Sequence, residues 1–218
     1  MGKHMKLEKS QVHILRDVKL ADPVFVDLAS SPRSPVYAVG QMLVGRTRAE
    51  KVGELYSPYF LDYVASGNAG LCSLPRLEFY ASTSVSPNLL ILLGEQHANP
   101  DDVYAYYDVA EAALDYGVLQ GCKAFISCVV FRSRRAEDII HVAATTSQEA
   151  SALAEKLGGK PFGLGRIVSQ MGPLLGLAKA RGFKVMSILG PLKGRPGDEA
   201  MANILLDRLV KALDLALV

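Results

Sequence analysis

The sequence predicts an α/β fold, a three-layer α/β/α sandwich with a mainly parallel central sheet, and two observations lead to this prediction. First, its short apolar runs are continuous rather than alternating, which is typical of strands covered on both faces. Second, these runs alternate with helical stretches, which is typical of strands joined by crossover helices. The chain has 218 residues, of which 50% are hydrophobic and 21% charged, as expected for one large domain.

Seven apolar runs are expected to be strands, and one further strand is expected at an edge of the sheet. The runs lie at 24–26, 36–39, 52–56, 89–93, 124–131, 139–143 and 185–189, and the edge strand lies within 12–18. In addition, residues 63–66 and 71–74 flank a Ser-Gly-Asn-Ala segment. Such a segment between two short strands is typical of a hairpin turn.

Four segments have the features of helices. The first follows Asn99 and Asp101, either of which can cap it, and its apolar residues recur at spacings of three and four. The second is expected to begin with Ser147 as its cap and to end at Gly158. The other two are expected at 173–181 and from about residue 198 to the C-terminus.

The last predicted helix carries two apolar stripes, where a surface helix normally carries one. Two arrangements account for a second stripe: the helix lies deep within one subunit, or it is shared with a neighbouring subunit. In the second case the stripe would be an oligomer interface. The first stripe consists of Met201, Leu205, Leu209 and Ala212, and the second of Leu206, Val210, Leu213 and Leu217.

Charge and composition argue against several classes of protein. The net charge is +2, and the basic cluster at 132–135 is followed directly by acidic residues, so no nucleic-acid surface is expected. No apolar run reaches the length of a membrane span. The three cysteines have no paired spacing and are interpreted as reduced thiols of a cytoplasmic protein. Residues 1–4 have the form of a cloning remnant, which leaves 5–218 as a single domain.

Residue patterns that would indicate catalysis or a cofactor are not found in the sequence. The four histidines are scattered without metal-ligand spacing, and no G-x-S-x-G nucleophile motif occurs. We therefore assign no catalytic residue, no metal site and no cofactor.

Three glycine-containing turns are candidate ligand sites. Gly40 and Gly45 belong to a segment close to the phosphate-binding loop pattern, which follows an expected strand. Arg46 replaces its lysine, and a tight strand-to-helix turn is the alternative interpretation.

The other two turns offer polar groups beside glycines. After the strand at 89–93 come Gly94, Glu95 and His97, at the edge where open α/β sheets bind ligands, and the latter two could do acid–base chemistry. Between Gly165 and Gly172, the Ser169 hydroxyl and backbone amides could bind a small anion. Ordinary surface polarity and close packing of the turn are the respective alternatives.

Several segments, in this order, resemble the proteasome assembly chaperone family. Residues 164–179 resemble its glycine-rich turn and the following Leu-Leu-Gly-Leu-Ala-Lys helix. Further similar segments lie at 54–60, 74–80, 89–94, 187–190 and 197–200, so that the resemblance covers roughly 20–215.

The resemblance implies a nucleoside-phosphorylase-like fold and an oligomeric assembly factor or scaffold that works through protein contacts. Its partners would be further copies of the chain, proteasome α subunits or a paralogous chaperone. The alternative is a small-molecule binder or enzyme on the same fold, using residues 94–97. The sequence departs from the family in three places: a C-terminal hydrophobic-Tyr-X tail, a helix-length segment at 40–51 and a glycine-rich turn near 128–132 are lacking.

Overall fold

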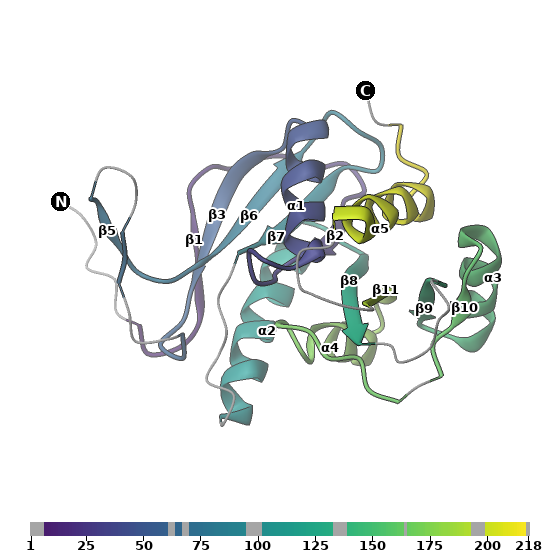
Figure 1. Ribbon diagram of the computed structural model, residues 1–218. Helices are drawn as coiled ribbons and strands as arrows, with labels where there is room; N and C mark the ends of the chain where they lie inside the picture. Colours follow the sequence, from purple (N-terminus) through teal and green to yellow (C-terminus); the bar gives the residue numbers. More distant parts are fainter. Residues whose placement is uncertain are drawn as a thin grey trace.

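A nine-stranded sheet forms the centre of the molecule, and the chain has an α/β fold with five helices among the residues that the structure describes (Figure 1). The structure is a computed structural model that describes residues 7–60, 64–66, 70–94, 102–132, 139–163, 165–192 and 199–216. The strand order is β1-β3-β6-β7-β2-β8-β11-β9-β10.

The bounds of the elements are as follows. The sheet consists of β1 (Gln11–Ile14), β2 (Val24–Asp27), β3 (Glu50–Tyr56), β6 (Leu77–Ser82), β7 (Leu89–Leu93), β8 (Ala124–Arg132), β9 (His141–Ala144), β10 (Lys160–Pro161) and β11 (Lys184–Leu192). The expected hairpin is formed by β4 (Ala65–Ser66) and β5 (Cys72–Ser73). The helices are α1 (Pro35–Arg46), α2 (Val103–Leu119), α3 (Ser147–Leu157), α4 (Leu174–Ala180) and α5 (Glu199–Ala212).

The sheet is mixed, which corrects the expectation of a mainly parallel sheet. Its central strands β7, β2, β8 and β11 are parallel, whereas β1, β3, β6 and β7 form an antiparallel series and β9 is antiparallel to β11. The antiparallel series depends on β6, which was not among the expected strands. In β6 the buried Leu77 and Phe79 alternate with the half-buried Glu78 and Tyr80, a pattern typical of a strand with one covered face.

Two hydrophobic cores lie on opposite faces of the sheet, because side chains alternate along each strand. Val24 and Val26 of β2 belong to one core together with residues of α1, α3 and α5. Phe25 belongs to the other core, which includes residues of α2 and α4. Helices therefore cover both faces of the central strands (Figure 1).

Helix α1 replaces the strand expected at 36–39. The Ser34 hydroxyl accepts a hydrogen bond from the Val36 N–H at 3.2 Å, and Pro35 occupies the first turn, so the helix begins before the valines. Gly40 and Gly45 are consequently helical, and the phosphate-loop interpretation was wrong. A Cβ at Gly40 would lie 2.4 Å from Leu93 Cδ1, so this glycine allows α1 to pack closely on β7. A helix therefore does occupy part of the segment 40–51, which the sequence left too short for one.

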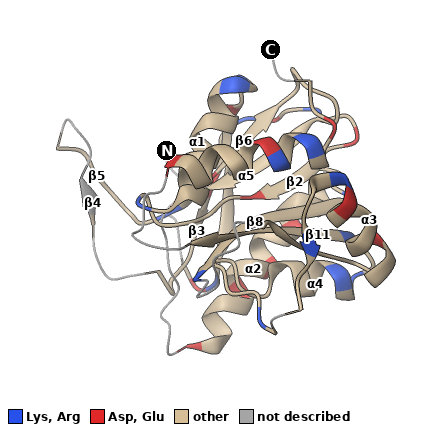
Figure 2. Cartoon of the chain, turned by 45° about the vertical axis from the view of Figure 1, so that its right-hand side comes forward, with Lys and Arg blue, Asp and Glu red and all other residues tan. Residues whose placement is uncertain are grey.

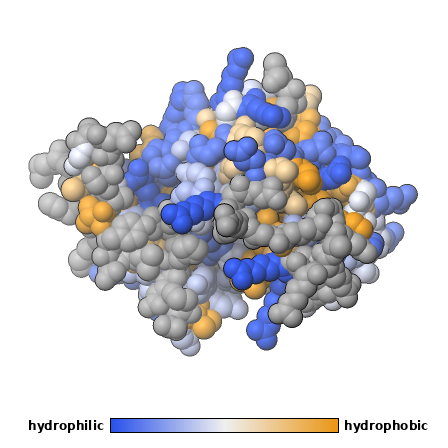
Figure 3. All heavy atoms as spheres, in the orientation of Figure 1, coloured by the Kyte–Doolittle hydropathy of each residue, from blue (hydrophilic) through white to orange (hydrophobic). Residues whose placement is uncertain are grey.

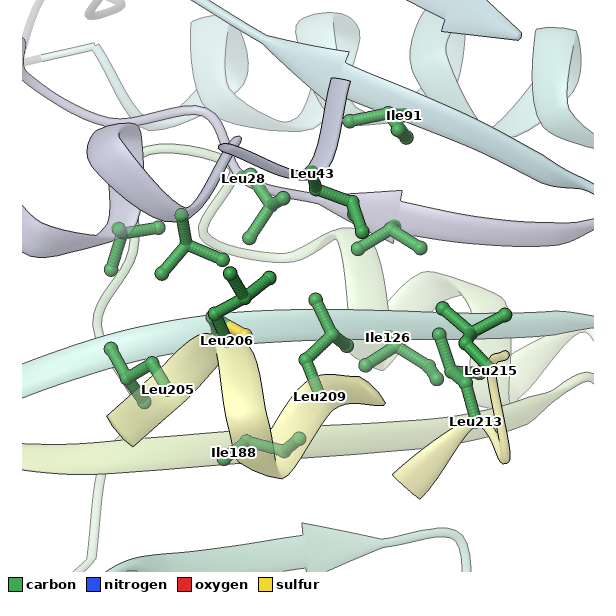
Figure 4. Packing of buried hydrophobic residues seen from close by; sticks show 14 of the residues in the cluster. Leu28, Leu43, Ile91, Ile126, Ile188, Leu205, Leu206, Leu209, Leu213 and Leu215 are labelled. Atoms are coloured by element: carbon green, nitrogen blue, oxygen red, sulfur yellow. The ribbon is translucent and has the colours of Figure 1, made fainter. Parts of the chain in front are cut away.

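The apolar face of helix α5 packs inside its own subunit. Leu206 and Leu213 are 2% and 7% exposed, and both lie in the same core as Leu205 and Leu209 (Figure 4). Val210 is partly buried against that core. Leu206 and Leu213 therefore do not face outward as an oligomer stripe would; Leu217 lies outside the described residues.

The helix caps explain where α2 and α3 begin. The Asp102 carboxylate accepts a hydrogen bond from the Ala105 N–H at 3.2 Å and caps α2, while the expected caps at 99 and 101 lie outside the described residues. Thr146, one residue before the expected cap, forms a capping box with Glu149 at the start of α3. Gly158 ends α3 in the left-handed conformation, as expected.

Candidate functional site

The chain changes faces at the carboxyl ends of the parallel strands β2 and β7. From β2 it continues into α1, whose residues join one core, and from β7 it leads to α2, whose residues join the other core. Adjacent strands that send their connections to opposite faces leave a crevice at their carboxyl ends, where open α/β proteins bind ligands. This edge of the sheet is therefore a candidate ligand-binding region.

A row of polar side chains crosses the sheet near this edge. Asp27 of β2, Ser127 of β8 and Ser187 of β11 are in register on neighbouring strands. They are 3%, 2% and 1% exposed, so all three are buried. The two serine hydroxyls are hydrogen-bonded to each other with their oxygens 3.0 Å apart. The row therefore places a carboxyl group beside a paired set of hydroxyls.

Burial governs the ionisation of Asp27. Its carboxylate accepts a hydrogen bond from the Ala29 N–H at 3.1 Å, and this bond favours the charged form. Desolvation is the larger effect, and it raises the pKa of Asp27 to about 7. Burial also raises the pKa of the neighbouring Cys128 thiol, and the charge of Asp27 adds to this effect. Asp27 is thus a carboxyl group that can exchange its proton near neutral pH.

Two cavities of about 330 Å³ each lie at this edge and share Ser169. We call the one that contains the polar row the Asp27 cavity. It is lined by Asp27, Ser127, Gly165, Ile167, Ser169, Gly172, Pro173, Leu174, Leu175 and Gly176. The second is lined by Ala29, Ser30, Ser31, Val36, Tyr106, Cys128, Val129, Val130, Val168, Ser169 and Gln170.

The glycine-rich turn before α4 forms one side of both cavities. Gly165 and Gly172 have φ angles of +101° and +32°, in the region where a glycine avoids a Cβ clash. The structure therefore brings Gly165, Ser169 and Gly172 to the lining of one cavity. It also places the carboxyl group of Asp27 in the cavity that they line.

Of the turn after β7, Gly94 alone lies within the described residues, while Glu95 and His97 lie outside them. The Gly94 carbonyl accepts a hydrogen bond from the Ser30 N–H at 2.9 Å, and Ser30 lines the second cavity. Gly94 therefore lies next to the cavity wall without being part of it.

Large apolar side chains are exposed in several places on the surface, among them the start of α2 and the hairpin β4–β5; others are Ile14, Leu15, Val118, Leu119, Val168 and Ile204. Val103, Tyr104 and Tyr107, which we call the α2 patch, are 65%, 83% and 48% exposed at the start of α2. The hairpin β4–β5 extends away from the sheet and exposes Leu71 and Leu74. In the orientation of Figure 1, hydrophobic residues are otherwise interspersed with hydrophilic ones (Figure 3).

Charged residues of both signs are interspersed along the described chain (Figure 2). In the most extensive cluster of charges, the residues form ion pairs with one another. Glu54 and Glu78 lie opposite each other on β3 and β6, and Lys51 Nζ contacts their carboxylates at 2.6 and 2.9 Å. Arg76 Nε contacts the same two carboxylates at 2.9 and 3.2 Å. Because the four charges sum to zero, this cluster holds the two strands together and offers no net charge to a partner.

Two other kinds of site are lacking in the described part of the chain. It contains no group of three or more His, Cys, Asp and Glu side chains arranged to hold a metal ion. None of its helices is long and apolar enough to cross a membrane.

Comparison with known proteins identifies the family. Residues 36–218 match the model of the PAC2 family. The structure is similar to that of PbaB of Pyrococcus furiosus, an archaeal proteasome activator, with a TM-score of 0.87 and 25% identity over 97% of this chain and 92% of that one.

Two further structures share the fold. PbaA of Pyrococcus furiosus, an archaeal homologue of a proteasome-assembly chaperone, has a TM-score of 0.75 and 19% identity over 95% of this chain and 84% of that one. A proteasome-assembly chaperone homologue of Mycobacterium tuberculosis has a TM-score of 0.69 and 10% identity over 89% of this chain and 87% of that one. No curated protein sequence matches. Because the family model matches most of the chain, this protein belongs to the PAC2 family, as its resemblance to the proteasome assembly chaperones implied.

Proposed function

We propose that this protein is an oligomeric assembly factor that binds other proteins and performs no catalysis, and that proteasome α subunits are among its partners. The observation that carries this proposal is its membership of the PAC2 family together with its structural similarity to an archaeal proteasome activator. On this proposal the helices on both faces of the mixed sheet form a three-layer, nucleoside-phosphorylase-like sandwich that serves as a scaffold.

The exposed apolar residues support a function based on protein contacts. Tyrosines are enriched in protein interfaces because each offers a large apolar area and a hydroxyl group. Tyr104 and Tyr107 lie one helical turn apart on α2, next to Val103, so they present one continuous apolar surface. The hairpin adds Leu71, which is 75% exposed. Contiguous apolar surface of this kind on a folded protein is typical of an interaction site.

The partners and the compartment follow from the same proposal. We propose that copies of the chain associate with each other and with proteasome α subunits or a paralogous chaperone in the cytoplasm. The free cysteines Cys72, Cys122 and Cys128 fit a reducing compartment. Leu206 and Leu213 are not the contact surface of this oligomer, because they already pack inside the subunit.

Native mass spectrometry tests the proposal. The purified protein is measured alone and after mixing with proteasome α subunits from the same source. We expect a discrete homo-oligomer that captures α subunits. The double variant Tyr104→Asp/Tyr107→Asp should weaken at least one of these associations, whereas Glu111→Gln, an exposed change on the same helix, should leave both intact. A monomer that ignores the α subunits would contradict the proposal.

A further inference from the structure

We propose that the Asp27 cavity binds a small organic cation, such as an amidinium or ammonium compound with a compact apolar body, and that the Asp27 carboxylate is its counter-ion. The proposal is independent of the assembly function, because it concerns a cavity within one subunit rather than the exposed apolar surface.

The charge of the cavity wall favours a cation. Asp27 contributes a carboxyl group, and no Lys, Arg or His is among the described residues that line either cavity. The hydrogen bond that Asp27 accepts from Ala29 comes from a neutral backbone amide. A buried carboxylate without a cationic partner is unfavourable, and a bound cation that donates N–H groups would remove this cost. The cavity therefore offers a cation an interaction that its described lining residues do not supply to Asp27.

On this proposal the ionised carboxylate disfavours the small anion that the sequence suggested for this turn. Ser169 and the turn between Gly165 and Gly172 do line a cavity, but Asp27 lines it too. An anion bound there would lie near a like charge in a poorly solvated site, where electrostatic repulsion is stronger than in water. The proposed ligand therefore has the opposite charge to the anion expected from the sequence.

The volume of the Asp27 cavity and its apolar lining residues indicate the uncharged part of the ligand. A volume of about 330 Å³ suits a molecule with one ring, since ligand pockets range from roughly 300 to 1,000 Å³. Ile167, Leu174 and Leu175 provide apolar contacts for a flat body, and the Ser127 and Ser169 hydroxyls can accept further N–H groups. Asp27 and Ser127 are held on adjacent strands, so the polar end of the site is rigid.

Three probes of nearly equal shape test the proposal: benzamidine is a cation, benzamide is neutral and benzoate is an anion. Their binding to the full chain is measured by isothermal titration calorimetry at pH 8, where Asp27 is ionised. We expect benzamidine to bind at least about tenfold more tightly than benzamide, and benzoate not to bind. Because protonation of Asp27 removes the counter-ion, benzamidine affinity should fall by about tenfold or more between pH 8 and pH 5.

Two variants test whether benzamidine binds in the Asp27 cavity. Asp27→Asn keeps the shape of the side chain and removes its charge, so benzamidine affinity should fall at least about tenfold. Asp207→Asn removes an acid whose side chain is 68% exposed on α5 and should change nothing. Absence of benzamidine binding at millimolar concentration, equal affinity for the three probes, or unchanged affinity in Asp27→Asn would each overturn the proposal.

Discussion

The pKa of Asp27 makes a prediction about how stability depends on pH. Burial raises this pKa from 3.8 to about 7, so the folded state favours the protonated carboxyl group. Well below pH 3.8 the group is protonated in both the folded and the unfolded state, so it does not lower the free energy of unfolding. As the pH rises toward 7 the unfolded chain releases the proton while the folded chain retains it, and stability falls. Above pH 7 the loss is complete.

The size of this loss follows from the shift. One pKa unit corresponds to about 1.4 kcal/mol, so a shift of about 3 units corresponds to about 4 kcal/mol. Asp27→Asn has no proton to release and avoids the loss. The variant should lie within about 1 kcal/mol of the wild type at pH 4, where the loss has only begun, and exceed it by up to about 4 kcal/mol at pH 8. For a chain of this length that difference is on the order of 10 °C in Tm.

Urea unfolding at pH 4, 6 and 8 measures the effect, with wild type and Asp27→Asn compared at one protein concentration because association also stabilises. Other carboxyl groups titrate in both proteins, so their contributions cancel in the difference. Asp207→Asn serves as the control and should show no pH-dependent difference. If the difference between wild type and Asp27→Asn were the same at pH 4 and pH 8, Asp27 would not be a desolvated, proton-exchanging group and the reasoning would fail.

Three further predictions concern the fold. Leu206→Ala should lower the free energy of unfolding by about 2–5 kcal/mol, because the residue is 2% exposed in the α5 core, and urea unfolding measures the loss. Gly117→Ala should cost about 1–3 kcal/mol, because a Cβ there would lie 2.7 Å from a ring atom of Phe25; an unchanged Tm would contradict this. Thr146→Ala should cost about 0.5–2 kcal/mol through loss of the α3 capping box, seen as a lower urea midpoint with an unchanged m-value.

Much of the central sheet could be predicted from the sequence, because its strands are long apolar runs. The error at 36–39 has a local cause. Val36, Tyr37 and Val39 have strand propensity, yet Ser34 and Pro35 just before them form a helix start, and the helix-starting pair prevails where the valines pack into the core. β6 is not apparent as a strand of a doubly covered sheet, because its alternating pattern is typical of a strand with one covered face rather than of a continuous apolar run.

The candidate site could be predicted only in part. Polar residues that interrupt apolar runs, such as Asp27, Ser127 and Ser187, are visible in the sequence. Their proximity in space is not visible there, since Asp27 and Ser127 are distant in the chain. They meet because the chain passes from β7 through α2 to β8, which lies on the other side of β2. The two apolar stripes of α5 left two arrangements open. The structure favours one of them because α1 packs on α5 and covers part of its surface.

The geometry keeps the two proposals separate. Asp27 is buried on β2, whereas Tyr104 and Tyr107 are exposed on α2, so a change in one group leaves the contacts of the other in place. Asp27→Asn should therefore leave the native mass of the oligomer unchanged. Conversely, Tyr104→Asp/Tyr107→Asp should leave the affinity for benzamidine unchanged. Tyr106, which lines the second cavity beside these tyrosines, is the one described residue of α2 lining either cavity. A coupling between cation binding and association would therefore have to cross from α2 to the lining of the Asp27 cavity, and the packing of α2 against α4 is one route for it.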